Sequence, residues 1–216
     1  MEIFIDTAIT EEIEKASKLG VIKGVTTNPS LLKKSGKTLK EVILEILKLV
    51  KGPVSAEVKE STAENMYYEA KEIVEMVGNN EYITIKLPMT EEGIKVCKKL
   101  SKEGIKTNVT LIFSLSQAIL AMEAGATFIS PFMGRMDDYY NNPEAGYNLI
   151  KKISQAKKEF NYHSKIIAAS IRNVNHVEQA ILAGADIATI PYKIINEMYE
   201  HELTTRGLEI FKKAEE

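Results

Sequence analysis

The stretch "YITIKLPMTEEGIKVCKKLSKEGIKTNVTLI" (82–112) predicts one complete strand–helix–strand unit. Residues 82–87 and 105–112 are nearly continuous in apolar character, which is typical of parallel strands covered on both faces. Residues 90–104, between them, carry acidic residues in the first turn and apolar residues at helical spacing. Gly104 ends the predicted helix, where a left-handed backbone favours glycine.

The same unit recurs along the whole chain. A helix that ends on glycine passes quickly into a strand in the segments "KLGVIKGV", "KEGIKTNV", "EAGATFIS" and "LAGADIAT". The predicted strands are 2–6, 22–27, 53–58, 82–87, 105–112, 126–132, 164–170 and 186–191. This repetition predicts an α/β fold, a single-domain (β/α)8 TIM barrel of parallel strands over residues 1–216 with an extra C-terminal helix. A doubly wound open sheet is the alternative, but no G-x-G-x-x-G motif follows any strand.

Composition and charge argue against several classes of protein. The net charge of −2 provides no basic surface for nucleic acid, and no apolar run is long enough to span a membrane. The single cysteine, Cys97, cannot form a disulfide within the chain, which favours a reducing compartment. The strand-like "EIFID" start leaves no signal peptide, so we expect a cytoplasmic protein. The histidines lie in separate segments without ligand spacing, so we expect no metal site: His163, His176 and His201.

Polar side chains follow nearly every predicted strand. In a (β/α)8 barrel, active-site groups lie at the carboxyl ends of the strands. The residues at those ends are Asp6, Thr26, Thr27, Asn28, Glu57, Lys86, Asn108, Thr110, Arg135, Ser170 and Arg172. Their shared position on one rim of the barrel predicts a functional site.

Each of these residues also has a purely structural interpretation. Asp6 and Asn28 could cap the helices that follow them. Lys86 could extend its ammonium group into water, and Glu57 could be exposed on the rim. The two arginines could form surface ion pairs with neighbouring carboxylates, Asp137 or Glu178.

Taken together, the residue types predict Schiff-base chemistry. Burial of Lys86 in an apolar barrel interior would disfavour its ammonium form and favour a free amine, which adds to a carbonyl. Asp6 and Glu57 supply carboxylates for proton transfer, while two arginines and Ser170 could hold a phosphate. The prediction is a lyase or transferase that acts on a phosphorylated sugar. The alternatives are sugar-phosphate binding without turnover, and isomerisation with Glu57 as the base and Lys86 as the electrophile.

Motifs at these positions carry a family resemblance. They are "FIDTA" (4–8), "GVTTNPSLL" (24–32), "SAEV" (55–58), "IKLPMTEEG" (85–93), "GIKTNVTLIFS" (104–114), "ISPFMGR" (129–135), "AASIRN" (168–173) and "AGADIATIP" (183–191). In order and over nearly the whole chain, they resemble the transaldolase family, and more narrowly its short subfamily, which also contains the fructose-6-phosphate aldolases. The resemblance implies a class I enzyme that uses neither a metal nor another cofactor.

The resemblance also implies roles for individual residues. Lys86 would form the Schiff base, and Asp6 would handle the proton of the hydroxyl whose carbon is cleaved. Glu57 and Thr110 would activate the water of carbinolamine dehydration and hydrolysis. The substrate-binding positions would be Thr26 in the pocket wall, Asn28 and Asn108 at substrate hydroxyls, and Arg135, Ser170 and Arg172 at the phosphate.

Substrates, pathway and assembly follow from the same resemblance. The donor would be fructose 6-phosphate or sedoheptulose 7-phosphate, and the acceptor erythrose 4-phosphate or glyceraldehyde 3-phosphate. The pathway would be the non-oxidative pentose phosphate branch. Members of the short subfamily form homo-oligomers, pentamers or decamers, in which the C-terminal helix, here "TTRGLEIFKKAEE" (204–216), reaches a neighbour.

Two positions distinguish transfer from free aldol cleavage. The aldolase-type members carry Gln at the position of Glu57, and Tyr where "SPFMGR" has Phe132. A phenol there could help deliver a proton through water, whereas a phenyl ring cannot. The sequence therefore predicts a transaldolase, with a fructose-6-phosphate aldolase that releases dihydroxyacetone as the alternative.

Overall fold

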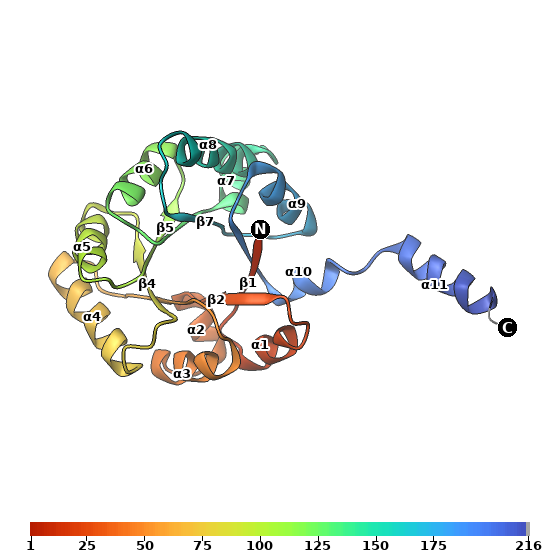
Figure 1. The fold of residues 1–216 in the computed structure, drawn as a ribbon, viewed down its shortest axis with the longest axis horizontal. Coiled ribbons are helices and arrows are strands. Elements are labelled where there is room, and N and C mark those ends of the chain that lie inside the picture. The colour runs from red at the N-terminus through yellow and green to blue at the C-terminus, as the bar shows by residue number, and fades with distance from the viewer. Residues whose placement is uncertain (215–216) are drawn as a thin grey trace.

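The strands close into a barrel at the centre of the molecule (Figure 1). A computed structural model describes residues 1–214. Every neighbouring pair of strands is parallel, and β1 pairs with β8, which confirms the predicted (β/α)8 barrel and shows that the open-sheet alternative is wrong. The strands are β1 (Glu2–Asp6), β2 (Ile22–Thr26), β3 (Val54–Glu57), β4 (Ile83–Pro88), β5 (Thr107–Ile112), β6 (Phe128–Pro131), β7 (Lys165–Ala168) and β8 (Ile187–Ile190).

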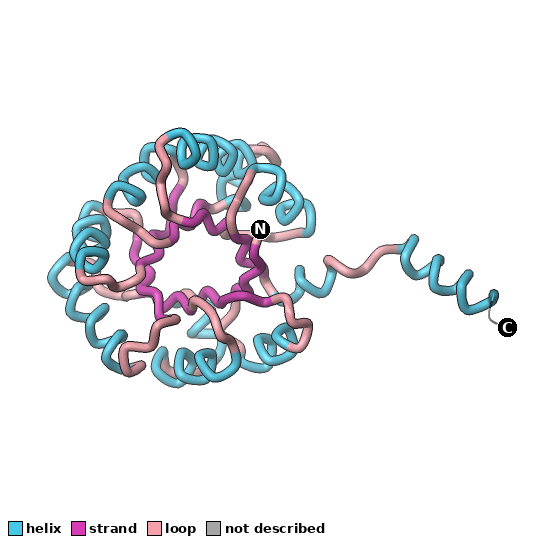
Figure 2. Tube along the Cα trace, in the orientation of Figure 1, coloured by secondary structure: helices cyan, strands magenta, loops and turns pink. Residues whose placement is uncertain are grey.

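Helices surround the barrel as an outer layer, except for the last helix, which projects from it (Figure 2). They are α1 (Thr10–Ser17), α2 (Pro29–Ser35), α3 (Leu39–Leu49), α4 (Ala63–Met76), α5 (Glu91–Lys102), α6 (Leu115–Glu123), α7 (Met133–Tyr140), α8 (Ala145–Glu159), α9 (Val174–Ala183), α10 (Tyr192–Glu197) and α11 (Glu202–Ala214). Local signals set their ends: Thr38 and Glu41 form a reciprocal capping box at α3. Gly104 and Gly184, after α5 and α9, have φ of +75° and +85°, so the predicted left-handed glycines are confirmed at both positions.

The amino ends of the strands are filled by apolar side chains. Phe4, Phe128, Ile167 and Ile187 form a buried cluster in which the two aromatic rings meet edge to face, 6.3 Å apart. Gly24 in β2 makes room for this cluster, because a Cβ there would lie 2.6 Å from the Phe4 ring. The apolar plug at one end leaves the carboxyl ends of the strands for the polar residues.

Helix α11 extends away from the barrel (Figure 1). It begins two residues before the predicted helix, and residues 215–216 of that prediction lie outside the described residues. None of its described residues is buried, and its exposed apolar side chains are Leu203, Leu208, Ile210 and Phe211. Among the helices within residues 1–214, none combines the length and apolar character needed to cross a bilayer.

Candidate active site

A cavity of about 150 Å³ opens at the carboxyl ends of the strands. It is lined by Asp6, Thr26, Asn28, Lys86, Thr110, Ser130, Phe132, Arg135, Ala169, Ser170 and Thr189. Strand register brings many of these side chains together, because register partners in parallel strands lie at the same level of the barrel. Asp6 in β1 is thus the partner of Thr26 in β2, and Thr110 in β5 is the partner of Ser130 in β6.

Lys86 occupies the wall of this cavity and is only 5% exposed. Its Nζ lies 2.9 Å from Oε2 of Glu57, its register partner in β3, and donates a hydrogen bond to the carbonyl oxygen of Thr27 at 3.0 Å. The expectation of an apolar environment was therefore wrong: Lys86 is buried, but a carboxylate and a carbonyl surround its nitrogen. Such a pair compensates for the cost of burying either charge alone.

Asp6 lies across the cavity from the strand that carries Lys86. Thr189 and Thr26 share a hydrogen bond of 2.6 Å, and the Thr26 hydroxyl donates to Oδ1 of Asp6 at 2.7 Å. Burial raises the pKa of Asp6 above its ordinary value of 3.8, although the charge of Lys86 and the Thr26 hydrogen bond offset part of the rise. Asp6 does not cap α1, whose N-cap residue is Ile9 and has no side-chain bond. The capping interpretation of Asp6 is therefore wrong.

Asn28, just before α2, and Thr110 in β5 line the same cavity. Asn28 does cap its helix, because Oδ1 accepts a hydrogen bond from the Leu31 amide at 3.0 Å, and it faces the cavity as well. Thr110 Oγ1 is buried and has no hydrogen-bond partner within residues 1–214. Leu111, the next residue, has φ of +61°, at a point where the β5–β6 register shifts. The cavity therefore contains an unpaired hydroxyl that a substrate or water could satisfy.

Four of the predicted rim residues do not line the cavity: Thr27, Glu57, Asn108 and Arg172. Glu57 contacts Lys86, which does line the cavity. The amide of Asn108 is fully buried and is already used, since Nδ2 donates to Ser55 and Oδ1 accepts from Ser130. The implied contact of Asn108 with a substrate hydroxyl thus stays a prediction.

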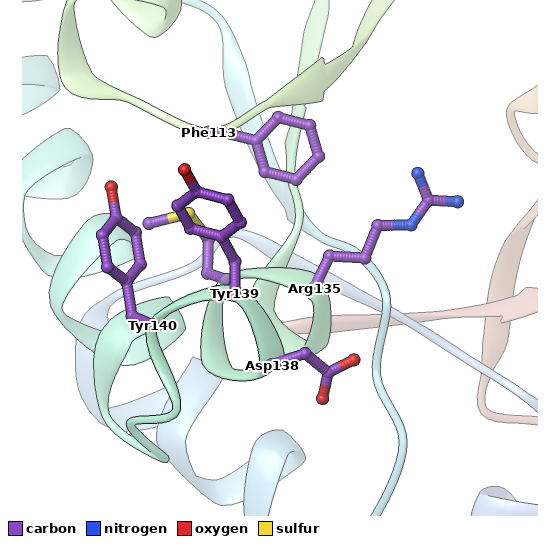
Figure 3. A pocket seen from close by; sticks show the side chains of 6 residues that line it. Phe113, Arg135, Asp138, Tyr139 and Tyr140 are labelled. Carbon is purple, nitrogen blue, oxygen red and sulfur yellow. The ribbon is translucent and has the colours of Figure 1, made fainter.

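The two arginines lie at the outer edge of the cavity. Arg135, on the first turn of α7, places its guanidinium carbon 5.1 Å from the centre of the Phe132 ring and lines the cavity. Arg172 pairs with Asp138, not with the carboxylates expected from the sequence, and its side chain is 45% exposed. Arg135 also borders a second cavity of about 540 Å³, lined by Phe113, Arg135, Met136, Asp138, Tyr139 and Tyr140 (Figure 3). This larger cavity contains no lysine, so the chemistry belongs to the smaller one.

The start of α7 is joined to the loop after β7 by backbone hydrogen bonds. The amides of Met133 and Gly134 donate to the carbonyl oxygens of Ala169 and Ser170, at 2.9 and 3.1 Å. A Cβ on Gly134 would lie 2.6 Å from that Ser170 oxygen and 2.7 Å from Nε of Arg172. Glycine at this position is therefore what allows the loop and its arginine to pack directly on α7.

Comparison with known proteins identifies the family. Residues 3–216 match the family described as Transaldolase/Fructose-6-phosphate aldolase. The chain belongs to this family.

Individual relatives agree with this assignment over nearly their full length. The chain is 54% identical to a probable transaldolase of Agathobacter rectalis, over 98% of this chain and 96% of the relative. It is 53% identical to the probable transaldolases of Carboxydothermus hydrogenoformans and Brachyspira hyodysenteriae, with 96% of each relative covered. This chain is therefore a transaldolase-family enzyme.

Within this transaldolase-family fold, two hydroxyl-bearing cavity residues were not predicted from the sequence. Ser130 and Thr189 line the cavity from β6 and β8. Both lie within motifs that carried the resemblance, "ISPFMGR" and "AGADIATIP". The signal that could have found them is a hydroxyl inside an otherwise apolar strand, where a bland barrel would carry Val, Ile or Leu.

Proposed function

We propose that this protein is a transaldolase that transfers a three-carbon dihydroxyacetone unit through a Schiff base on Lys86. The observation that carries the proposal is the buried contact of 2.9 Å between Lys86 Nζ and the Glu57 carboxylate, beside the Asp6 carboxyl. An amine nucleophile must lose a proton before it attacks, and Glu57 is within reach of that proton. Asp6 provides a second proton acceptor in the same cavity.

The reaction follows from these positions. The Lys86 amine adds to the ketose carbonyl at C2, and loss of water from the carbinolamine leaves an iminium ion. Asp6 accepts the proton of the C4 hydroxyl as the C3–C4 bond breaks, and the electron pair moves into the iminium to give an enamine. The aldose phosphate departs. The enamine carbon then attacks the acceptor aldehyde, Asp6 returns the proton to the new hydroxyl, and hydrolysis releases the product ketose and Lys86.

Water for the dehydration and hydrolysis steps would lie between Glu57 and Thr110. The unpaired Oγ1 of Thr110 supports this role, because it has a free donor and acceptor in the cavity. Asn28 and Thr26 would hold substrate from the β2 side, and Ser130 and Thr189 extend the set of hydroxyls available to a polyol.

The phosphate would be held at the β6–β7 edge by Arg135, Ser170 and Arg172. Arg135 and Ser170 line the cavity there, while Arg172 does not line it and pairs with Asp138. A guanidinium group forms paired hydrogen bonds with a phosphate, so Arg172 would exchange one anionic partner for another on substrate binding.

Transfer is favoured over aldol cleavage by Glu57 and Phe132. The Phe132 ring packs edge to face against Phe113, 5.6 Å away, and offers no hydroxyl to protonate the enamine. We therefore infer ketose-phosphate donors, aldose-phosphate acceptors and a place in the non-oxidative pentose phosphate pathway of the cytoplasm. The alternative is a fructose-6-phosphate aldolase, which the family description also includes.

We also propose a homo-oligomer, a pentamer or decamer, in which α11 contacts a neighbouring subunit. The exposed apolar side chains of α11 and its separation from the barrel support this arrangement. Light scattering tests the assembly, and a monomer at micromolar concentration would contradict it.

The test of function is product analysis with fructose 6-phosphate, first alone and then with erythrose 4-phosphate. A transaldolase gives little free dihydroxyacetone in the first case and rapid sedoheptulose 7-phosphate in the second. Rapid dihydroxyacetone release without an acceptor would assign the aldolase function instead. Borohydride reduction in the presence of substrate separates both from isomerisation or simple binding, because only a Schiff base leaves a stable adduct on Lys86.

A further inference from the structure

A nearly buried carboxylate–imidazole contact lies behind the phosphate edge of the cavity. Asp137 on α7 and His176 on the first turn of α9 have side chains that are 11% and 9% exposed, and Oδ2 lies 3.1 Å from Nε2. Oδ2 has no hydrogen bond of good geometry within residues 1–214, so His176 is the group that faces this oxygen. None of the steps proposed above uses either residue.

The other nitrogen of His176 fixes the tautomer of the ring. Nδ1 accepts a hydrogen bond from the backbone amide of Arg172 at 3.3 Å, so Nδ1 carries no proton and the proton of the neutral ring is on Nε2, toward Asp137. The backbone of His176 is fixed as well, because its amide donates to Oδ1 of Asn173, the N-cap residue of α9, at 2.8 Å. Asp137 is itself anchored to α8 through the Gly146 amide, at 2.8 Å.

The amide that His176 holds belongs to Arg172, whose side chain is half exposed. The guanidinium of Arg172 contacts Asp138 near the surface, and this contact does not fix the position of the Arg172 backbone. The hydrogen bond from the Arg172 amide to His176 fixes that position. The loop after β7 therefore contacts α7 in two places. The Ser170 carbonyl accepts a hydrogen bond from the Gly134 amide, and His176, which holds the Arg172 amide, contacts Asp137.

We propose that His176, oriented by Asp137, is a positioning residue for the proposed phosphate-binding residues Arg135, Ser170 and Arg172. It holds the backbone at Arg172 so that the arginine and Ser170 face the same anion as Arg135, which stands on the helix that carries Asp137. This inference rests on the proposed phosphate role of that edge. The expected signature is a change in the affinity for phosphorylated ligands with little change in the chemical step.

Two substitutions at one position separate the two contacts of the ring. The amide oxygen of His176→Asn takes the place of Nδ1 and can still accept from Arg172, but this side chain does not reach Asp137. The amide nitrogen of His176→Gln takes the place of Nε2 and keeps a group facing Asp137, but the acceptor for Arg172 is lost. We expect His176→Gln to raise KM for fructose 6-phosphate about tenfold, equivalent to about 1.4 kcal/mol, at nearly unchanged kcat. We expect His176→Asn to change KM by no more than about twofold, much less than the tenfold change for His176→Gln. It should lower the melting temperature, because Asp137 loses the group that faces it.

Unphosphorylated fructose as donor and inorganic phosphate as ligand provide the controls. Neither variant should change the kinetics with fructose, and only His176→Gln should reduce the rise in melting temperature that inorganic phosphate produces. Two results would show that His176 is only structural and would overturn the proposal. One is an equal rise in KM for fructose 6-phosphate in both variants, and the other is a rise in KM for fructose as large as that for fructose 6-phosphate. If His176→Gln does not fold, His176→Ala also removes the acceptor for Arg172 and takes its place. A KM close to that of the unsubstituted protein would overturn the proposal, and a tenfold rise with fructose 6-phosphate but not with fructose would support it. Because phosphate binding is measured without turnover, a failure here is distinct from a failure of the transaldolase assignment.

Discussion

The two sides of the cavity are built in different ways. On the β1–β5 side, Asp6, Glu57 and Lys86 are strand residues whose positions follow from register; Lys86 contacts Glu57, and Asp6 is held by a hydrogen bond from Thr26. On the β6–β7 side, Arg135 and Arg172 stand on a helix start and a loop and are exposed. Bond-making groups require fixed geometry, which strands provide, whereas long cationic side chains can reach a phosphate from less rigid elements. Substitutions on the strand side should therefore reduce the rate, and those on the loop side should reduce affinity.

Replacement of Lys86 gives the largest expected effect. Lys86→Met should abolish turnover and the borohydride-trapped adduct, because no amine remains. It should also lower the melting temperature, since Glu57 is left buried without its partner. The double substitution Lys86→Met with Glu57→Gln should recover stability but not activity. Lys165→Met, which replaces an exposed lysine at the start of β7, is the control. Any substantial activity of Lys86→Met would refute the Schiff-base mechanism.

Asp6→Asn should separate activity from stability. We expect kcat to fall by about 10²–10⁴, the usual contribution of a proton-transfer group. Because the pKa of Asp6 is raised in the folded state, its ionised form costs folding free energy at neutral pH, and that cost disappears as pH falls toward the unfolded value of 3.8. The asparagine variant should therefore melt at a higher temperature than the unsubstituted protein at pH 7, with the difference shrinking in acid. A variant less stable at pH 7 would contradict this environment for Asp6.

Substitution of the arginines tests the other side of the comparison. Arg135→Ala and Arg172→Ala should each raise KM for fructose 6-phosphate roughly ten- to hundredfold, as expected from the loss of one charge-assisted contact. The kinetics with unphosphorylated fructose should change little. Lys18→Ala, at the C-cap of α1, removes a comparable exposed charge away from the cavity and should behave as the unsubstituted protein does. Equal losses with both donors would mean that the arginines are structural.

Phe132→Tyr gives the smallest expected effect and lies where the two sides meet. The added hydroxyl should raise dihydroxyacetone release from fructose 6-phosphate in the absence of acceptor, because it can relay a proton to the enamine through water. The ratio of free dihydroxyacetone to sedoheptulose 7-phosphate measures the change. An unchanged ratio would remove Phe132 as the determinant of transfer.

The sequence predicted the strand side of the site better than the loop side. The pattern of apolar residues predicted the strands. In a parallel barrel the carboxyl ends of all strands lie on one rim, so the sequence alone was enough to assign Asp6 and Lys86 to a common cavity. The sequence could not give the partners. The polar surroundings of Lys86 depend on register between β3 and β4, and the pairing of Arg172 with Asp138 depends on how α7 packs against a loop. Such contacts between separate segments leave no periodic signal.

Gly134 has a consequence for how this chain can diverge. A side chain there would displace the Ser170 carbonyl and the Arg172 side chain, so the "ISPFMGR" and "AASIRN" motifs are not free to drift independently. Among homologues, a larger residue at position 134 should appear together with a shorter residue at position 172. The two motifs should therefore evolve as one co-varying unit, although more than thirty residues separate them in the chain.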